Sequence, residues 1–299
     1  MAAWIYFVFI AYVIWTITSI IDKIVISKGH IKSPLVFIIL NGLMNILLIF
    51  IVPFSSLSKL SYFEIGLAIT YGIALNIGVT LYYKAVQYEE ISKIIILNQI
   101  VPVFVLVLSY IFLGEILTSK QLIGFLFLIG AGILVSYRKS KESFHVNKAV
   151  YLIFLSSFAV AIAHVASKQV YSSTDFWSAF IWLRLASFSS LLLLLVPKIR
   201  NDFTRTFSRM NKKIKSLLGF KMLIDFSAFI FFGFAVLNGK ISLVNSLGNS
   251  LHPLFVFIGA LLISLYMPSL FKEKIDKASM LTKLASIILI IAGVVFVNS

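Results

Sequence analysis

Long apolar runs without alternation dominate the pattern of residues along this chain. A helix needs about 20 apolar residues to cross a bilayer core, whereas membrane β-strands alternate apolar and polar positions over about ten residues. The segments Ile94 to Leu97 and Leu191 to Leu195 are apolar at every position, so the pattern predicts helices. The runs of spanning length cover residues 4–21, 34–53, 64–83, 94–113, 120–137, 149–167, 176–196, 217–237, 242–266 and 280–298.

The connections between these runs are short. The longest covers residues 197–216 and is basic and polar, so no segment is large enough for a separate soluble catalytic domain. No basic stretch precedes the first run, and it has no obvious small-residue cleavage site. This predicts a retained span rather than a signal peptide. Whatever the protein does is therefore expected to happen inside the membrane.

Composition agrees with a membrane protein. Of the 299 residues, 60% are hydrophobic and only 12% are charged, against about a quarter in soluble domains. The mean hydropathy is +1.03, and a soluble fold of this length cannot bury that much apolar surface. These values predict an all-α polytopic protein of the cell (cytoplasmic) membrane and exclude a soluble enzyme. The chain has no cysteine, which excludes disulfides and thiolate metal sites.

The net charge of +15 reports orientation rather than a nucleic-acid partner. Lys and Arg in short loops mark the cytoplasmic side of a membrane protein. Twenty of the 26 basic residues belong to the odd-numbered connections and four to the other face. With ten spans, this bias predicts that both termini lie outside.

The two halves of the chain resemble each other. Residues 98–104 read Asn-Gln-Ile-Val-Pro-Val-Phe, and residues 249–255 read Asn-Ser-Leu-His-Pro-Leu-Phe. Five spans per half is an odd number, so two copies must enter the membrane in opposite directions. Many secondary transporters use this plan, with a binding site at the repeat interface. The chain is therefore predicted to form two inverted five-helix repeats around a central cavity, residues 1–140 and 141–299.

The paired prolines of the fourth and ninth spans are candidates for the substrate pathway. A proline inside a helix frees the carbonyl four residues earlier, and here both carbonyls belong to asparagines. Each kink would then place a free carbonyl and an amide at the cavity. The alternative is a packing kink whose Asn is bonded between helices. The cavity candidates at the kinks are Asn98, Gln99, Pro102, Asn249, His252 and Pro253.

Ionisable residues inside spans are costly and usually face the interior of the bundle. Arg184 in the seventh span either holds an anionic group or pairs with an internal carboxylate. Asp225 lies four residues after Lys221, a spacing that favours a salt bridge within one helix. The alternative for Asp225 is a proton-coupling carboxylate.

The ends of the first and sixth spans carry candidate gating residues. His164 and Lys168 lie one turn apart, and Asp22 and Lys23 occupy the equivalent position in the first span. Long side chains near a span end also reach to the interface without a gating role, so both interpretations stay open. Tyr82 offers an aromatic surface for the substrate, although belts and cores use aromatic residues as well.

Residues 82–135 resemble the EamA-type repeat of the drug/metabolite transporter superfamily. The resemblance rests on Tyr-Tyr-Lys-Ala-Val-Gln-Tyr from Tyr82, on Leu113-Gly114-Glu115 at the exit of the fourth span, and on Gly130-Ala131-Gly132. It implies two inverted five-helix repeats, export or exchange of small organic metabolites, and a structural or gating role for Glu115.

The chain departs from the family pattern in three respects. The Leu-Gly-Glu sequence does not recur after the ninth span, where Ser264 to Pro268 stands instead. Asn41 occupies the place of an Arg often seen in the second span, while Arg184 is present in the seventh. Family members are also more often described with both termini inside, opposite to the orientation that the charges predict.

The predicted function is secondary-active transport of a small organic metabolite by alternating access. No zinc-peptidase, nucleophile-elbow or phosphate-loop motif is present, so we expect neither an enzyme nor ATP-driven transport by this chain alone. A proton gradient or exchange then supplies the energy, with no cofactor. The expected partners are a small-molecule substrate and the bilayer, in a monomer or homodimer. The alternatives are a flippase for a lipid-linked intermediate and a non-transporting scaffold or sensor.

Overall fold

The computed structural model describes residues 2–27, 31, 33–55, 57–89, 91–136, 148–266 and 277–298. These residues form helices and no strands. Ten of the helical segments are long and apolar enough to cross a membrane. The predicted class, an all-α multi-pass membrane protein with ten spans, is therefore confirmed.

The first five spans alternate between continuous and interrupted helices. The second span tightens from α-helix to 3₁₀-helix halfway, and the fourth is divided by a turn. The elements are α1 (Ala3–Ser27), α2 (Pro34–Leu43), the 3₁₀ segments η1 (Met44–Phe50) and η2 (Val52–Phe54), α3 (Tyr62–Ala85), α4 (Ile91–Asn98), α5 (Val101–Leu113) and α6 (Ser119–Ser136).

The last five spans follow a similar order. The seventh span, like the second, changes to 3₁₀-helix halfway. The elements are α7 (Lys148–Ser173), α8 (Phe176–Ser187), η3 (Phe188–Leu195), α9 (Pro197–Arg209), α10 (Lys212–Asn238), α11 (Ile241–Tyr266) and α12 (Lys277–Asn298). The element α9 is an additional amphipathic helix in the longest connection, where the sequence predicted a polar linker only.

The fourth span is broken rather than kinked. The helix α4 ends at Asn98, and Pro102 lies in the first turn of α5, where its missing N–H costs no hydrogen bond. The expectation that Pro102 sits inside a continuous helix is therefore wrong. Pro253, by contrast, does lie inside the continuous helix α11.

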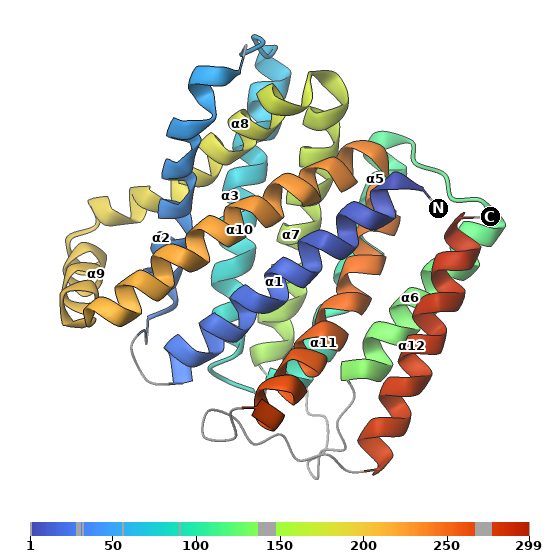
Figure 1. Cartoon of the computed structure of the whole chain (residues 1–299). Helices are drawn as coiled ribbons and strands as arrows, with labels where there is room; N and C mark the ends of the chain where they lie inside the picture. Colours follow the sequence, from blue (N-terminus) through green and yellow to red (C-terminus); the bar gives the residue numbers. More distant parts are fainter. Residues whose placement is uncertain are drawn as a thin grey trace.

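The helices pack in reciprocal pairs across the two halves. Helix α1 packs against α10 and α11, and α7 packs against α3 and α5. Helices α6 and α12 lie side by side at one edge of the bundle (Figure 1). Gly124 permits this close approach, because a Cβ there would lie 2.8 Å from the carbonyl oxygen of Gly293.

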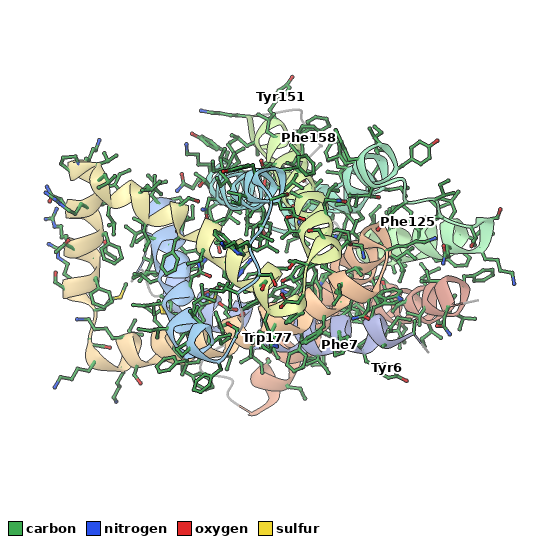
Figure 2. All side chains as sticks on the ribbon, turned by 90° about the horizontal axis from the view of Figure 1, so that it is seen from above. Tyr6, Phe7, Phe125, Tyr151, Phe158 and Trp177 are labelled. Carbon is green, nitrogen blue, oxygen red and sulfur yellow. The ribbon has the colours of Figure 1, made fainter. Side chains whose placement is uncertain are left out.

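The outside of the bundle is apolar, as a lipid-facing surface requires. Ile46 is 61% exposed and Phe112 is 71% exposed. Figure 2, viewed from above, shows Tyr6 and Tyr151 projecting away from the bundle. In a soluble protein such a surface would cause aggregation, whereas here it faces the hydrocarbon core.

The two ends of the chain meet at one face of the bundle (Figure 1). The Ala2 N–H donates to Asn298 Oδ1 over 2.9 Å. An even number of spans requires the two ends to lie on the same face. We call this face the terminal face. The opposite face, where α1 ends and α10 begins, carries the Lys- and Arg-containing helix α9 and is called the basic face.

Candidate functional site

A cavity of about 390 Å³ lies within the bundle. It is lined by residues from α1, α2, η1, α3, α8, α10 and α11, and thus from both halves of the chain. Tyr12, Arg184 and His252 lie halfway along their spans, while Asp22, Phe37 and Tyr83 lie toward the basic face. The cavity therefore extends from the middle of the bundle toward the basic face.

A charged cluster joins three helices at the side of the cavity. Lys221 Nζ lies 2.6 Å from Asp225 Oδ2 and 3.4 Å from Asp22 Oδ1, and it donates to Asn41 Oδ1 over 3.0 Å. The predicted salt bridge between Lys221 and Asp225 is confirmed. The second carboxylate comes from α1, so one lysine ties α1 and α2 to α10.

Arg184 contributes a second buried cation to the cavity. Its guanidinium carbon lies 4.0 Å from the centre of the Phe229 ring and 5.3 Å from that of Tyr71. Within the described part of the chain it forms no salt bridge, so of the two interpretations of Arg184 the pairing with an internal carboxylate finds no support there.

Neutral polar side chains complete the lining. The His252 Nε2 atom lies 3.0 Å from Ser19 Oγ, which connects α11 to α1. Asn76 Nδ2 on α3 donates to Ser189 Oγ over 2.9 Å. Ser19 and Asn76 were not predicted from the sequence, although an asparagine within a span such as residues 64–83 is itself a signal for an interior position.

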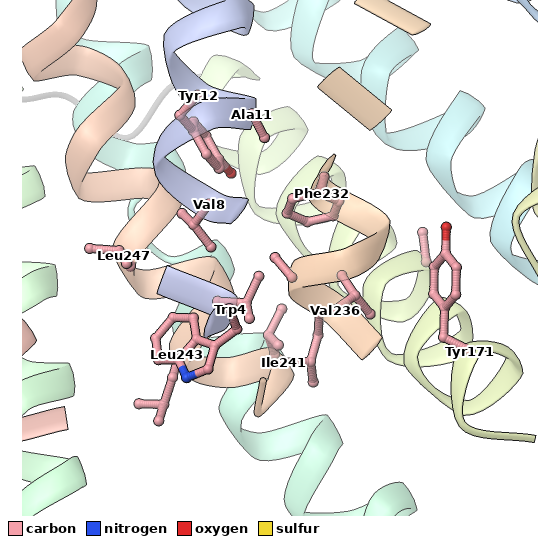
Figure 3. Packing of buried hydrophobic residues seen from close by; sticks show 14 of the residues in the cluster. Trp4, Val8, Ala11, Tyr12, Tyr171, Phe232, Val236, Ile241, Leu243 and Leu247 are labelled. Carbon is pink, nitrogen blue, oxygen red and sulfur yellow. The ribbon is translucent and has the colours of Figure 1, made fainter. Parts of the chain in front are cut away.

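The interior is closed by packed apolar residues toward the terminal face. Figure 3 shows Trp4 and Val8 of α1 beside Ile241 and Leu247 of α11. The rings of Phe176 and Phe234 stack with their centroids 3.7 Å apart. Access to the cavity from the terminal face would require these helices to separate.

The two proline regions meet each other. Gln99 Nε2 donates to the carbonyl oxygen of Asn249 over 3.2 Å. That carbonyl lies four residues before Pro253 and is the acceptor that a helical proline leaves free. Asn98, Gln99, Pro102, Asn249 and Pro253 are not among the residues that line this cavity, and their pathway role stays a prediction.

Glu115 and Lys168 bind helix ends near the terminal face. Glu115 Oε1 accepts from the Ile241 N–H over 3.0 Å and so caps the start of α11. Lys168 Nζ donates to the carbonyl oxygens of Val236, Leu237 and Gly239, at the end of α10, over 2.8–3.1 Å. Gly114 turns the chain before Glu115 with a φ of 64°, a conformation that favours glycine.

The remaining candidates lie outside the cavity lining. The His164 ring is tilted against Phe232 with the centroids 5.6 Å apart. Tyr82 meets its neighbour Tyr83 edge to face, and only Tyr83 lines the cavity. The side chain of Lys23 lies outside the described residues.

Comparison with known proteins finds a family match for the first half of the chain. Residues 2–137 match the EamA-like transporter family, which confirms the resemblance inferred from the sequence. No curated protein matches the chain. Among solved structures, a protein described only as "Crystal structure of protein" is similar in fold with a TM-score of 0.67. It is 14% identical, and the match covers 98% of this chain and 96% of that one.

Proposed function

We propose that this membrane protein, whose residues 2–137 match the EamA-like transporter family, is a secondary-active carrier that moves a small organic metabolite by alternating access. The observation that carries the proposal is the cavity of about 390 Å³, which is lined by both halves of the chain and contains charged side chains. A space of this size suits a small molecule. Charged groups inside a membrane bundle typically mark a substrate or ion pathway.

An inverted repeat is supported by the reciprocal arrangement of the helices. The first span packs on the eighth and ninth, and the sixth packs on the third and fourth. The second and seventh spans both change to 3₁₀-helix, at Met44 and at Phe188. Each relationship is reproduced when the two halves of the chain are exchanged, as a twofold-related pair of repeats requires.

The proposed transport cycle starts from a state open toward the basic face. The charge bias favours this face as the cytoplasmic one, so in the proposed cycle this conformation is the inward-open state and both termini lie outside. Separation of the apolar cluster around Trp4, Phe176 and Phe234 would open the other side. Rocking of one repeat against the other would exchange the two states.

Asp22, Lys221 and Asp225 form the proposed coupling group. One lysine between two carboxylates leaves the cluster with one excess negative charge, which a proton neutralises. Protonation would loosen the tie between α1 and α10 and so couple proton movement to opening of the bundle. His252, hydrogen-bonded to Ser19 on α1, is a second titratable group in the same cavity.

Reconstituted vesicles provide the test of transport. We expect the purified protein to move at least one amino acid, sugar, nucleotide or organic acid under a proton gradient or in exchange. Val79→Trp fills the cavity and should abolish that flux, whereas Val13→Trp, at a position 47% exposed on the bundle surface, should retain it. Absence of flux for every class of solute, or equal flux in both variants, would contradict the proposal.

A further inference from the structure

Arg184 is a buried cation that has no counterion among the residues that the structure describes. The residue is only 3% exposed, and it lines the cavity. In the part of the chain that the structure describes, no carboxylate pairs with its guanidinium and no hydrogen bond from it is formed. Lys221, the other buried cation of the cavity, has two carboxylates within 3.4 Å.

An unpaired guanidinium in a membrane bundle is costly. Burial of a charge without a partner is unfavourable, and the faces of Tyr71 and Phe229 compensate only part of that cost. The two rings hold the guanidinium in place, while its N–H groups have no acceptor in the described part of the chain. A guanidinium presents its donors as a planar fork that matches a carboxylate in a bidentate manner.

The charged residues of the cavity favour a ligand that carries one negative charge. Among the described residues, Asp22 and Asp225 both pair with Lys221, whereas no carboxylate pairs with Arg184, so Arg184 is the cavity cation that can bind an anion. A dianion such as a phosphate monoester would leave one charge uncompensated near the two carboxylates. Trp15 and Phe229, with ring centroids 5.2 Å apart, offer an apolar surface beside the guanidinium.

We propose that Arg184 binds the carboxylate of the transported molecule, so that the substrates of this carrier are small organic molecules with one carboxylate group. The inference rests on the proposed transport function and adds the chemical class of the cargo. The apolar part of the molecule packs against Trp15 and Phe229. Arg184 thereby selects a carboxylate over the neutral amide of the same shape.

Matched pairs of ligands test the inference on the purified full-length protein. The probes are butyrate, hexanoate and 3-phenylpropanoate, each beside its own amide, with phenyl phosphate as the dianion. Thermal unfolding is followed, because a ligand that binds the folded state raises the apparent Tm. We expect at least one carboxylate to raise the Tm while its amide and phenyl phosphate do not.

Variants of Arg184 locate the effect. Arg184→Gln should weaken carboxylate binding about tenfold or more. Arg184→Lys keeps the positive charge but loses the bidentate guanidinium donors, so it should retain only part of the affinity. The control is Arg200→Gln on the exposed helix α9, which removes a cation outside the cavity and should bind as the wild type does. If Arg184→Gln fails to fold, the comparison of acid and amide in the wild type still shows whether binding selects a carboxylate.

Vesicle uptake of the same acid and amide separates this inference from the proposed function. Uptake of both at equal rates would overturn the carboxylate subsite and leave the transporter standing. Carboxylate-selective binding lost in Arg184→Gln, without uptake of either compound, would support the subsite and contradict transport. Equal stabilisation by acid and amide, stabilisation by neither, or a larger effect of phenyl phosphate would overturn the inference.

Discussion

The charged cluster depends on Lys221, because among the described residues it is the cation that pairs with both Asp22 and Asp225. The spacing of Lys221 and Asp225 predicted their salt bridge, since residues four apart share one helix face. The contact with Asp22 was not predictable in the same way. It depends on how α1 packs against α10, and a single sequence contains no direct signal for that contact.

Removal of the lysine charge should destabilise the folded protein. Lys221→Met leaves two buried carboxylates without their cation, which costs about 3–5 kcal/mol when one partner of a buried pair is removed. We expect a clear fall in the apparent Tm of the purified protein. Lys215→Met, six residues earlier at a half-buried position, is the matched control.

The triple variant Asp22→Asn, Lys221→Met, Asp225→Asn tests the electrostatic explanation. It removes all three charges and should recover most of the lost stability. If it is no more stable than Lys221→Met alone, then lost packing around the lysine stem rather than uncompensated charge explains the fall.

At the scale of elements, the helices were predictable and their interruptions were not. Apolar runs of about 20 residues predict spans by length alone. A proline, however, has one meaning inside a helix and another in the first turn of a new one, as Pro253 and Pro102 show. The match between the two Asn-x-x-x-Pro sequences could not distinguish a break after Asn98 from a continuous α11.

Helix caps at the terminal face give a prediction for Glu115. Glu115→Ala removes the acceptor for the Ile241 N–H and should lower stability by about 1 kcal/mol. Glu115→Gln keeps an acceptor oxygen and should lose less. Thermal unfolding of both variants beside the wild type measures the difference, and equal loss in both would show that charge rather than capping matters.

Asp175 caps α8 outside the membrane-spanning segments and gives a pH-dependent prediction. The hydrogen bonds that it accepts from Ser178 hold the pKa of Asp175 below its ordinary value. The stabilisation is therefore fully present above the ordinary pKa of about 3.9 and is lost as the pH falls through the lowered value. Asp175→Asn retains an acceptor for the cap but removes this titration.

The measurement compares the apparent Tm of the wild type and of Asp175→Asn at acid pH. The apparent Tm of the wild type should fall further than that of Asp175→Asn between pH 5 and about pH 3. Parallel curves for the two proteins would show that the cap makes no contribution in this range. The exposed position of Asp175 makes the expected difference small.

At the scale of the whole molecule, composition and charge predicted the class of protein, whereas only the structure shows which residues line the cavity. The hydropathy predicted a polytopic bundle, and the ten spans confirm it. A central cavity with Arg184 and His252 was predicted, but most of its lining was not, because the lining depends on which spans become neighbours. Asp22, Asn76 and Arg184 are far apart in the sequence and line one space only in the fold.

Orientation in the membrane is the first prediction at this scale. The excess of Lys and Arg in odd-numbered connections predicts that both termini lie outside. A C-terminal reporter that is active only in the cytoplasm should therefore be silent. An active reporter would show that the termini lie in the cytoplasm. The basic face, toward which the cavity extends, would then be the outer face.

The central claim is that one cavity is exposed alternately to both sides of the membrane. The absence of native cysteine allows a single introduced thiol to be followed without background. Asn76→Cys places that thiol in the cavity. Ile46→Cys, at a lipid-facing position, and Ser208→Cys, on the exposed helix α9, serve as controls.

The decisive measurement is labelling of Asn76→Cys by a membrane-impermeant maleimide applied separately to each side of sealed vesicles of known orientation. We predict labelling from both sides, with Ser208→Cys labelled from one side only and Ile46→Cys from neither. Labelling of Asn76→Cys from a single side, or from neither, while Ser208→Cys reacts normally, would contradict alternating access.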